Sequence, residues 1–159
     1  MRKVISNTTP ILSLLKINQL ILLKELYGSL VVPSAVYYEI ERGRDWPYYV
    51  DLSKIEWIEV REVQNQESLN YFFDLDRGEA EVLVLAKEID AELVILDENL
   101  GRRYAKQLQL NLTGTIGVLL RSKRKGLVSS VKDLLLELKD KGVWLSPSLI
   151  DQVTKLAGE

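Results

Sequence analysis

The chain alternates short apolar runs with amphipathic segments. Continuous apolar runs of three or four residues predict buried strands, and alternation of apolar with polar residues predicts a strand at a sheet edge. The run Trp57–Val60 has the alternating pattern. The strands expected from these patterns are Val4–Ser6, Leu30–Val32, Trp57–Val60, Leu93–Leu96 and Leu110–Thr113.

Between the strands, apolar residues recur three and four positions apart, as on one face of a helix. Proline in a first turn and glycine after a last turn mark several helix ends. The expected helices begin at the turn Asn7–Pro10 and continue through Leu15, then cover Gln19–Tyr27, Ser34–Glu41, Gly78–Ile89, Glu98–Gln107, Thr115 to the basic residues that follow Arg121, Val131–Lys139 and Ser148–Leu156. Alternating strands and helices predict an α/β fold with a mostly parallel sheet and helices on both faces.

A length of 159 residues, without an internal repeat or a Gly/Ser linker, fits one domain. We expect a single domain over residues 1–159, with a core at about 3–127 and C-terminal helices over 128–159 that pack on it or form a dimer contact. No apolar run approaches the roughly 20 residues of a membrane span, and the N-terminus shows no secretory signal. The expected location is therefore the cytoplasm, without a membrane partner.

Composition narrows the chemistry. The chain has no cysteine and no histidine, which excludes thiolate zinc sites, serine-histidine hydrolases and histidine-dependent ribonucleases. Carboxylates are then the first candidates for catalysis. The net charge is -2 and the pI about 5.4, so any contact with nucleic acid has to be local.

Four positions fall where a carboxylate cleft could form: Asn7, Glu39, Glu79 and Asp97. Asn7 and Asp97 follow strands, and ligands of open parallel sheets bind beyond the carboxyl ends of the strands. Clustered oxygen ligands suit Mg²⁺ or Mn²⁺, which would activate water for phosphodiester hydrolysis without a histidine.

Each acid also has a plain structural interpretation. Asp97 could cap a helix that begins at Glu98, and Glu79 could complement the positive end of its own helix dipole. Glu39, on a helix that also carries Glu41 and Arg42, could lie on a solvated face. With 23 acids in the chain, spacing alone does not decide between these roles and metal binding.

The local sequence motifs around these positions indicate a family more specifically than the spacing of the acids does. The segments VISNTTPIL, VVPSAVYYEI, DRGEAEVLVLAKEIDAELVILDENLGRR and TGTIGVLLRSKRKGL resemble, in this order, the PIN domain over residues 3 to 127. The nearest branch is that of prokaryotic PIN-like proteins described as predicted nucleic-acid-binding proteins, which are related to VapC-type toxins. The resemblance implies a three-layer α/β/α fold and a metal-dependent ribonuclease.

Residue by residue, the resemblance assigns the catalytic and metal-binding positions to Asn7, Glu39, Glu79 and Asp97. The first of these is an acid in the family and an amide here. Thr8 and Thr9 take the place of hydroxyl residues that support the first position, and Glu98 or Asp76 could compensate for its missing charge. The implied cofactor is Mg²⁺ or Mn²⁺, and the implied substrate is RNA.

Two groups of cations could contact a nucleic-acid backbone. Arg102 and Arg103 follow Asp97 by about one helical turn, with a salt bridge to Glu98 or Asp97 as the alternative. The run Arg121, Lys123, Arg124 and Lys125 is the densest positive cluster. Its alternative is a solvated helix end, where cations favour the negative end of the dipole.

The hypothesis that follows is a Mg²⁺- or Mn²⁺-dependent endoribonuclease, as the toxin of a toxin-antitoxin pair with an antitoxin protein as partner. The alternative is a weakened or inactive PIN-like module that binds nucleic acid or protein. A nucleotide-handling α/β protein is disfavoured because the chain has no Gly-rich phosphate loop. We also expect a homodimer, through Trp46, Tyr48 and Tyr49 or the C-terminal helices.

Overall fold

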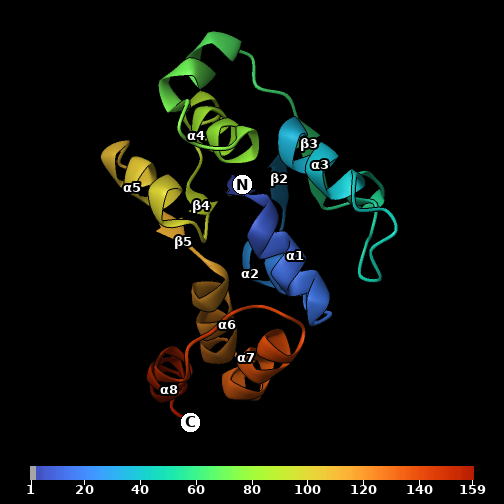
Figure 1. Cartoon of the computed structure of the whole chain (residues 1–159), viewed down its shortest axis with the longest axis vertical. Coiled ribbons are helices and arrows are strands. Elements are labelled where there is room, and N and C mark those ends of the chain that lie inside the picture. The colour runs from blue at the N-terminus through green and yellow to red at the C-terminus, as the bar shows by residue number, and fades with distance from the viewer. Residues whose placement is uncertain (1–2) are drawn as a thin grey trace.

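A parallel sheet of five strands lies at the centre of the computed structural model, which describes residues 3–159 (Figure 1). All four strand pairs are parallel, in the order β3-β2-β1-β4-β5. The strands are β1 Val4–Ser6, β2 Leu30–Pro33, β3 Ile58–Arg61, β4 Leu93–Ile95 and β5 Leu112–Thr113. Strand β3 is at an edge, as the alternating sequence of this segment predicts.

The strand order reverses between β1 and β4. Strands β2 and β3 follow β1 on one side, whereas β4 and β5 lie on the other. In the central pair Ser6 is opposite Ile95, and the backbone N–H of Asn7 donates to the carbonyl of Ile95. Both strands therefore end at the same edge, where open α/β sheets bind ligands.

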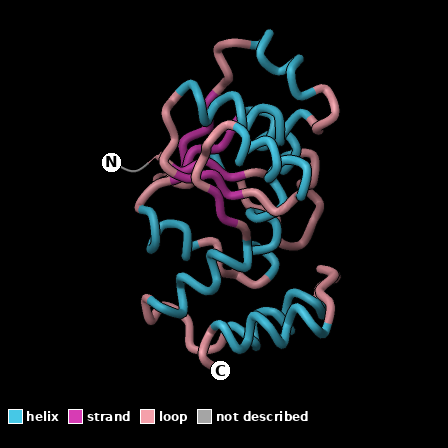
Figure 2. The backbone as a smooth tube through the Cα atoms, turned by 90° about the vertical axis from the view of Figure 1, so that its left-hand side faces the viewer, coloured by secondary structure: helices cyan, strands magenta, loops and turns pink. Residues whose placement is uncertain are grey.

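Helices cover both sides of the sheet (Figure 2), which confirms the expected three-layer α/β/α architecture. The α-helices are α1 Thr8–Lys16, α2 Ile21–Tyr27, α3 Ser34–Glu41, α4 Arg77–Glu88, α5 Asn99–Gln107, α6 Thr115–Arg124, α7 Val131–Asp140 and α8 Pro147–Leu156. Two 3-10 helices, η1 Leu52–Lys54 and η2 Gln66–Phe72, lie in segments for which the sequence predicted no element.

Most residues of helix α4, whose N-terminal end lies in the site region, are buried. Its residues from Gly78 to Ala86 are all buried, as expected for a helix that is apolar around most of its surface. Asp76 caps it, because its side chain accepts a hydrogen bond from the backbone N–H of Glu79, so the helix begins at Arg77. Two glutamates, Glu79 and Glu81, are buried with this helix.

The C-terminal helices α7 and α8 lie together at one end of the molecule (Figure 1). The Glu159 carboxylate accepts hydrogen bonds from Val131 N and Lys132 N at the start of α7, and these bonds lower the pKa of Glu159 to about 2. Lys141 Nζ donates to the carbonyl of Lys16 at the end of α1. None of the helices formed by residues 3–159 is long and apolar enough to cross a membrane.

Candidate functional site

Asn7 and Glu39 come together at the N-terminal end of α4. A Cβ on Gly78 would lie 3.3 Å from Asn7 Oδ1 and 3.3 Å from Glu39 Oε2. Because residue 78 is glycine, both oxygens can approach the first turn of α4, whose dipole favours negative charge. Residues from β1 and α3, far apart in sequence, thus meet at one helix end.

Asn7 is 3% exposed, and its Oδ1 forms no hydrogen bond within residues 3–159. It precedes α1 without capping this helix through its side chain. A buried acceptor without a partner costs about 1–3 kcal/mol. The unused oxygen beside Glu39 is therefore an available ligand for a cation.

Thr8 holds Glu39 in place. Its hydroxyl donates a hydrogen bond of 2.7 Å to Glu39 Oε2. Glu39 is exposed, as the surface alternative expected, yet this bond turns its carboxylate toward Asn7. Thr9, the other hydroxyl residue of this turn, is exposed.

Glu79 is 7% exposed and sits one position beyond Gly78. Burial raises the pKa of Glu79 to about 8, helped by a side-chain hydrogen bond with Asp76 and by the charges of Asp76, Glu98 and Glu39. Its Oε2 faces α5, 2.9 Å from where a Cβ on Gly101 would lie. Four carboxylates thus act on one another around this helix start.

Asp97 lies beyond the end of β4 and is held by helix α6. Its two oxygens accept from Thr115 N at 2.8 Å and Thr115 Oγ1 at 2.6 Å. The alternative in which Asp97 caps the following helix is wrong: Glu98 occupies the N-cap position of α5, without a side-chain cap. Asp97 instead satisfies the first turn of α6 because β5 brings Thr115 beside β4.

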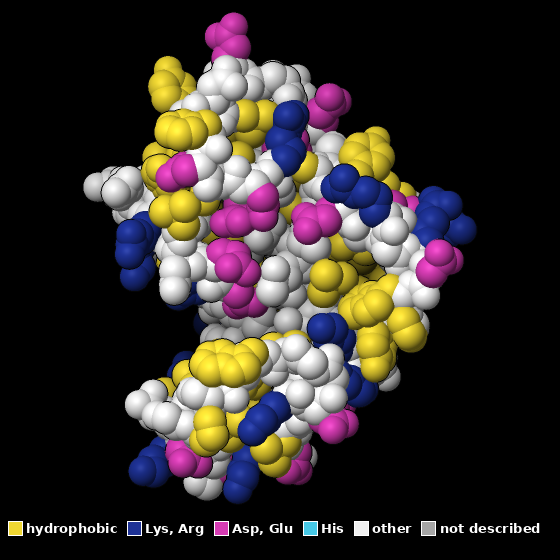
Figure 3. All heavy atoms as spheres, viewed as in Figure 1, with side chains coloured by type: hydrophobic (Ala, Val, Ile, Leu, Met, Phe, Trp, Pro, Cys, Tyr) yellow, Lys and Arg dark blue, Asp and Glu magenta, His cyan; other side chains and the backbone are white. Residues whose placement is uncertain are grey.

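Figure 3 shows acidic side chains gathered in the middle of the face onto which α3, α4 and α5 converge. Within residues 3–159, however, no three acidic side chains form a ready-made set of metal ligands. Of the four expected positions, Asn7 and Glu39 both bring an oxygen to the same point, beside Gly78. The roles of the four positions stay predictions.

A family model described as a PIN domain matches residues 3–159. The chain belongs to the PIN-domain family. This confirms the resemblance expected from residues 3 to 127 and extends it through α8. A comparison with curated proteins finds no match. The fold is thus that of a nuclease-like PIN domain.

Arg102 is hydrogen bonded to the backbone at the acidic edge of the PIN domain. Its Nη1 donates a hydrogen bond of 2.7 Å to the carbonyl of Leu96 and would lie 3.1 Å from a Cβ on Gly114. The salt bridge with Glu98 or Asp97 that the sequence allowed does not form within the described chain. Arg103, by contrast, is exposed.

The four residues of the basic run do not form one surface, because two have partners within the chain and two are exposed. Arg121 lies 5.9 Å from the ring centroid of Tyr27, and Lys123 donates to the carbonyl of Ser129 and pairs with Glu159 at 3.4 Å. These two cations are therefore engaged within the PIN domain. Arg124 and Lys125 are exposed at the end of α6 and stay available to solution.

Sequence reasoning missed Glu81, which is 4% exposed. Its Oε1 accepts from Ala35 N in the first turn of α3 at 3.0 Å, and its Oε2 pairs with Arg77 Nε at 2.7 Å. Glu81 thereby fixes the start of α3 against α4, the two helices that carry Glu39 and Glu79. The second acid of the run GEAE was the available signal, because an acid on a buried face requires a partner.

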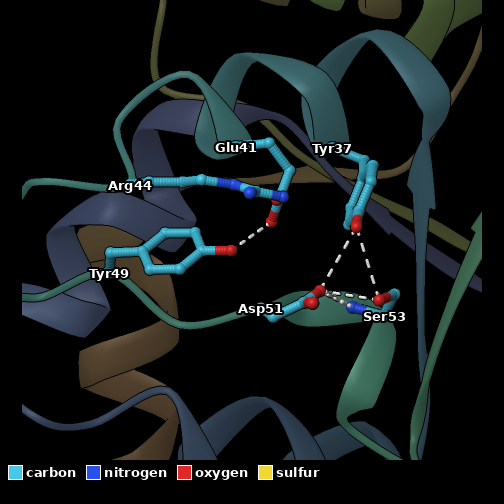
Figure 4. A network of polar contacts seen from close by, with 6 residues as sticks. All are labelled: Tyr37, Glu41, Arg44, Tyr49, Asp51 and Ser53. Carbon is cyan, nitrogen blue, oxygen red and sulfur yellow. Dashed lines mark hydrogen bonds and ion pairs between the residues drawn. The ribbon is translucent and has the colours of Figure 1, made fainter.

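A second polar network supports the other end of α3 (Figure 4). Glu41 accepts from Tyr49 Oη at 2.5 Å and pairs with Arg44 at 2.7 Å. The hydrogen bond to Glu41 raises the pKa of Tyr49 to about 12. The loop that carries Tyr49 is therefore fastened to α3, which limits the movement of the helix that presents Glu39.

Proposed function

We propose that this PIN domain is a divalent-metal-dependent endoribonuclease that hydrolyses RNA phosphodiesters. The observation that carries the proposal is the unpartnered, buried Oδ1 of Asn7, which lies beside the Glu39 carboxylate at the N-terminal end of α4. An oxygen acceptor that no donor of residues 3–159 satisfies, set beside a carboxylate, is a suitable ligand for a hard cation.

The residues fit a hard cation. Mg²⁺ and Mn²⁺ prefer oxygen ligands. The residues that would hold the ion through their side-chain oxygens are Asn7, Glu39, Glu79 and Asp97. Burial is the main cause of the raised pKa of Glu79, and the neighbouring negative charges that add to the shift are of the kind that a bound cation offsets. When bound, the ion would supply positive charge against the phosphodiester and lower the pKa of water.

The chain's own contribution is placement. Thr8 orients one oxygen of Glu39, Thr115 orients both oxygens of Asp97, and Glu81 sets α3 against α4. The N-terminal dipole of α4 adds a field that favours an anion at this edge. Arg103, which is exposed on α5, is the arginine that we assign to contact with the RNA backbone.

The second candidate function is a binding module without hydrolysis. Asn7 favours it, because an amide brings no charge and weakens cation binding relative to an acid. The test is a Mn²⁺ titration by calorimetry on the wild type and on Asp97→Asn, with cleavage of a mixed single-stranded RNA pool. The control is Asp151→Asn, which removes an exposed acid on α8, away from the site.

Metal binding and cleavage in the wild type and in Asp151→Asn, and loss of both in Asp97→Asn, would support the endoribonuclease. Mn²⁺ binding without cleavage, or RNA binding without Mn²⁺ binding, would favour the module. Cleavage that persists in Asp97→Asn would remove Asp97 from the site.

A toxin role with an antitoxin partner belongs to the same proposal. Its test is expression of the chain alone and together with the product of the neighbouring gene; unaffected growth in the first case counts against a toxin.

For the homodimer, Trp144 is 85% exposed beside the C-terminal helices, whereas Trp46 and Tyr48 contact Lys16 and Lys141 within the chain. Trp144→Ser should therefore shift a dimer toward monomer in gel filtration.

A further inference from the structure

A cavity of about 770 Å³ adjoins the acidic site. Glu39, Gly78 and Asp76 belong to its wall and also surround the site described above. The remaining wall comes from the rest of α3, from the segment that follows β3, and from α4. The cavity is therefore continuous with the place where a phosphodiester would be bound.

Tyr38 provides a flat apolar surface on this wall. It is 62% exposed, and it lies on α3 one turn after Ser34 and one turn before Arg42, both of which also line the cavity. An exposed ring that lines a cavity is a platform on which a nucleobase of any type can stack, because every base has a flat aromatic face.

The platform is held from behind by Tyr37. The two rings lie 5.5 Å apart at an angle of 65°, an edge-to-face arrangement. Tyr37 Oη is in turn hydrogen bonded to Asp51 Oδ1 and Ser53 Oγ at 3.2 and 3.3 Å (Figure 4). A stacking partner of Tyr38 thus meets a ring that is already supported.

The charges that line the cavity favour an uncharged base over a phosphate. Four acids and two arginines line the cavity: Glu39, Glu62, Asp76 and Glu81 against Arg42 and Arg77. Both arginines are exposed, but Arg77 pairs with Glu81 and donates to Gln66, whereas Arg42 forms no salt bridge within residues 3–159. An uncharged base with N–H donors suits this lining, whereas a phosphate inside the cavity would be repelled.

We propose that this cavity is a subsite for one unpaired nucleobase of single-stranded RNA, stacked on Tyr38, with Arg42 contacting the adjoining phosphate. The inference rests on the proposed endoribonuclease function and adds what that function leaves open, namely how the strand is seated. Tyr38 and Glu39 line the same cavity, so a strand seated on Tyr38 would pass close to the acidic site. The subsite also favours single strands, because a paired base cannot leave its stack without a cost.

The test measures binding of a fluorescein-labelled single-stranded RNA by anisotropy, once in EDTA and once in Ca²⁺. Tyr38→Leu removes the ring, Tyr38→Phe retains it, and Tyr71→Leu removes a still more exposed tyrosine outside the cavity lining. We expect Tyr38→Leu to weaken binding about tenfold or more. Tyr38→Phe and Tyr71→Leu should bind like the wild type, and the same RNA in a duplex should bind more weakly.

Cleavage assays separate the two proposals. In the presence of Mn²⁺, Tyr38→Leu should raise KM and leave kcat nearly unchanged, since the ring positions the strand and touches no reacting atom. Wild-type cleavage together with unchanged binding and KM in Tyr38→Leu would overturn the subsite and leave the endoribonuclease intact. A wild-type chain that neither binds nor cleaves RNA would overturn both.

Discussion

Thr8 Oγ1 and Glu39 Oε2 are joined by a hydrogen bond of 2.7 Å, although the two residues are 31 positions apart. The bond links the turn after β1 to the second half of α3. Without it, Glu39 would be one of several exposed acids on a helix surface. With it, the carboxylate faces Asn7 and the start of α4, so a hydroxyl group decides whether Glu39 belongs to the site.

Thr8→Val should therefore weaken Mn²⁺ binding while the fold is retained. Valine keeps the branched shape of threonine but cannot donate to Glu39, and loss of a residue that orients a metal ligand typically costs about 10- to 100-fold in affinity. Calorimetric titration with Mn²⁺ measures the effect. Thr9→Val is the matched control, because Thr9 occupies the same turn and is exposed. Equal affinities in the two variants would rule out an orienting role for Thr8.

Asn7→Asp should lower the stability of the metal-free protein and strengthen Mn²⁺ binding, whereas Asn7→Leu should have the reverse effect on both quantities. A carboxylate at this buried position adds a negative charge beside Glu39, which destabilises the metal-free protein by about 1–3 kcal/mol and strengthens Mn²⁺ binding about tenfold or more. Leucine removes the unpartnered oxygen, so the metal-free protein should gain stability and bind Mn²⁺ more weakly.

Urea unfolding in EDTA and calorimetry with Mn²⁺ measure these two quantities for both variants. Asn7→Asp should recover its lost stability when Mn²⁺ is added. If the aspartate variant binds Mn²⁺ no better than the wild type, the oxygen of residue 7 is not a ligand.

The raised pKa of Glu79 predicts that metal-free stability falls with pH. The folded-state pKa of about 8 lies above the ordinary value of 4.5, so the folded chain retains a proton that the unfolded chain releases between these values. The stabilising contribution is complete below about pH 4.5 and is lost as pH rises through 8. Thermal unfolding in EDTA between pH 5 and 8.5 should show the decline.

Glu79→Gln should flatten this decline, because glutamine has no proton to lose. In the wild type Mn²⁺ should restore stability at pH 8.5, since a cation favours the charged carboxylate. Glu98→Gln, which alters a more exposed neighbour, should retain most of the slope. A wild-type slope that is identical to that of Glu79→Gln would assign the decline to other groups.

The sequence predicts those features that local pattern determines. Apolar runs and capping residues locate the five strands and the eight α-helices that the structure describes in residues 3–159, and the parallel order places Asn7 and Asp97 at one edge. Pairing between distant side chains is different. Asp97 bonds to Thr115 and Glu81 to Ala35, over 18 and 46 positions, and no period in the sequence indicates which partner satisfies a given acid.

The same limit explains the cations. A run of four basic residues suggests one surface, yet the helical turn of α6 and the return of the chain at Glu159 give Arg121 and Lys123 separate internal partners. Likewise, the sequence shows Tyr38 next to Glu39 but not the cavity that both line, because its opposite wall comes from α4 and the segment that follows β3.

Glu81 offers the sharpest test of how the fold positions the site. Glu81→Ala removes the acceptor of Ala35 N and leaves Arg77 to water, so it should lower the free energy of unfolding by about 1–3 kcal/mol. Glu81→Gln retains an oxygen for Ala35 N and should cost about half as much. Urea unfolding measures both losses.

Because α3 carries Glu39, the position of this helix should also affect metal binding. We expect Mn²⁺ affinity to fall in Glu81→Ala and to be largely kept in Glu81→Gln, although neither substitution touches the cation. Glu88→Gln is the control, since Glu88 lies on the same helix and accepts from Gln64 N and Asn65 N, away from α3. If Glu81→Ala and Glu88→Gln bind Mn²⁺ equally well, the contact between α4 and the start of α3 does not position Glu39, and the site depends on Thr8 alone.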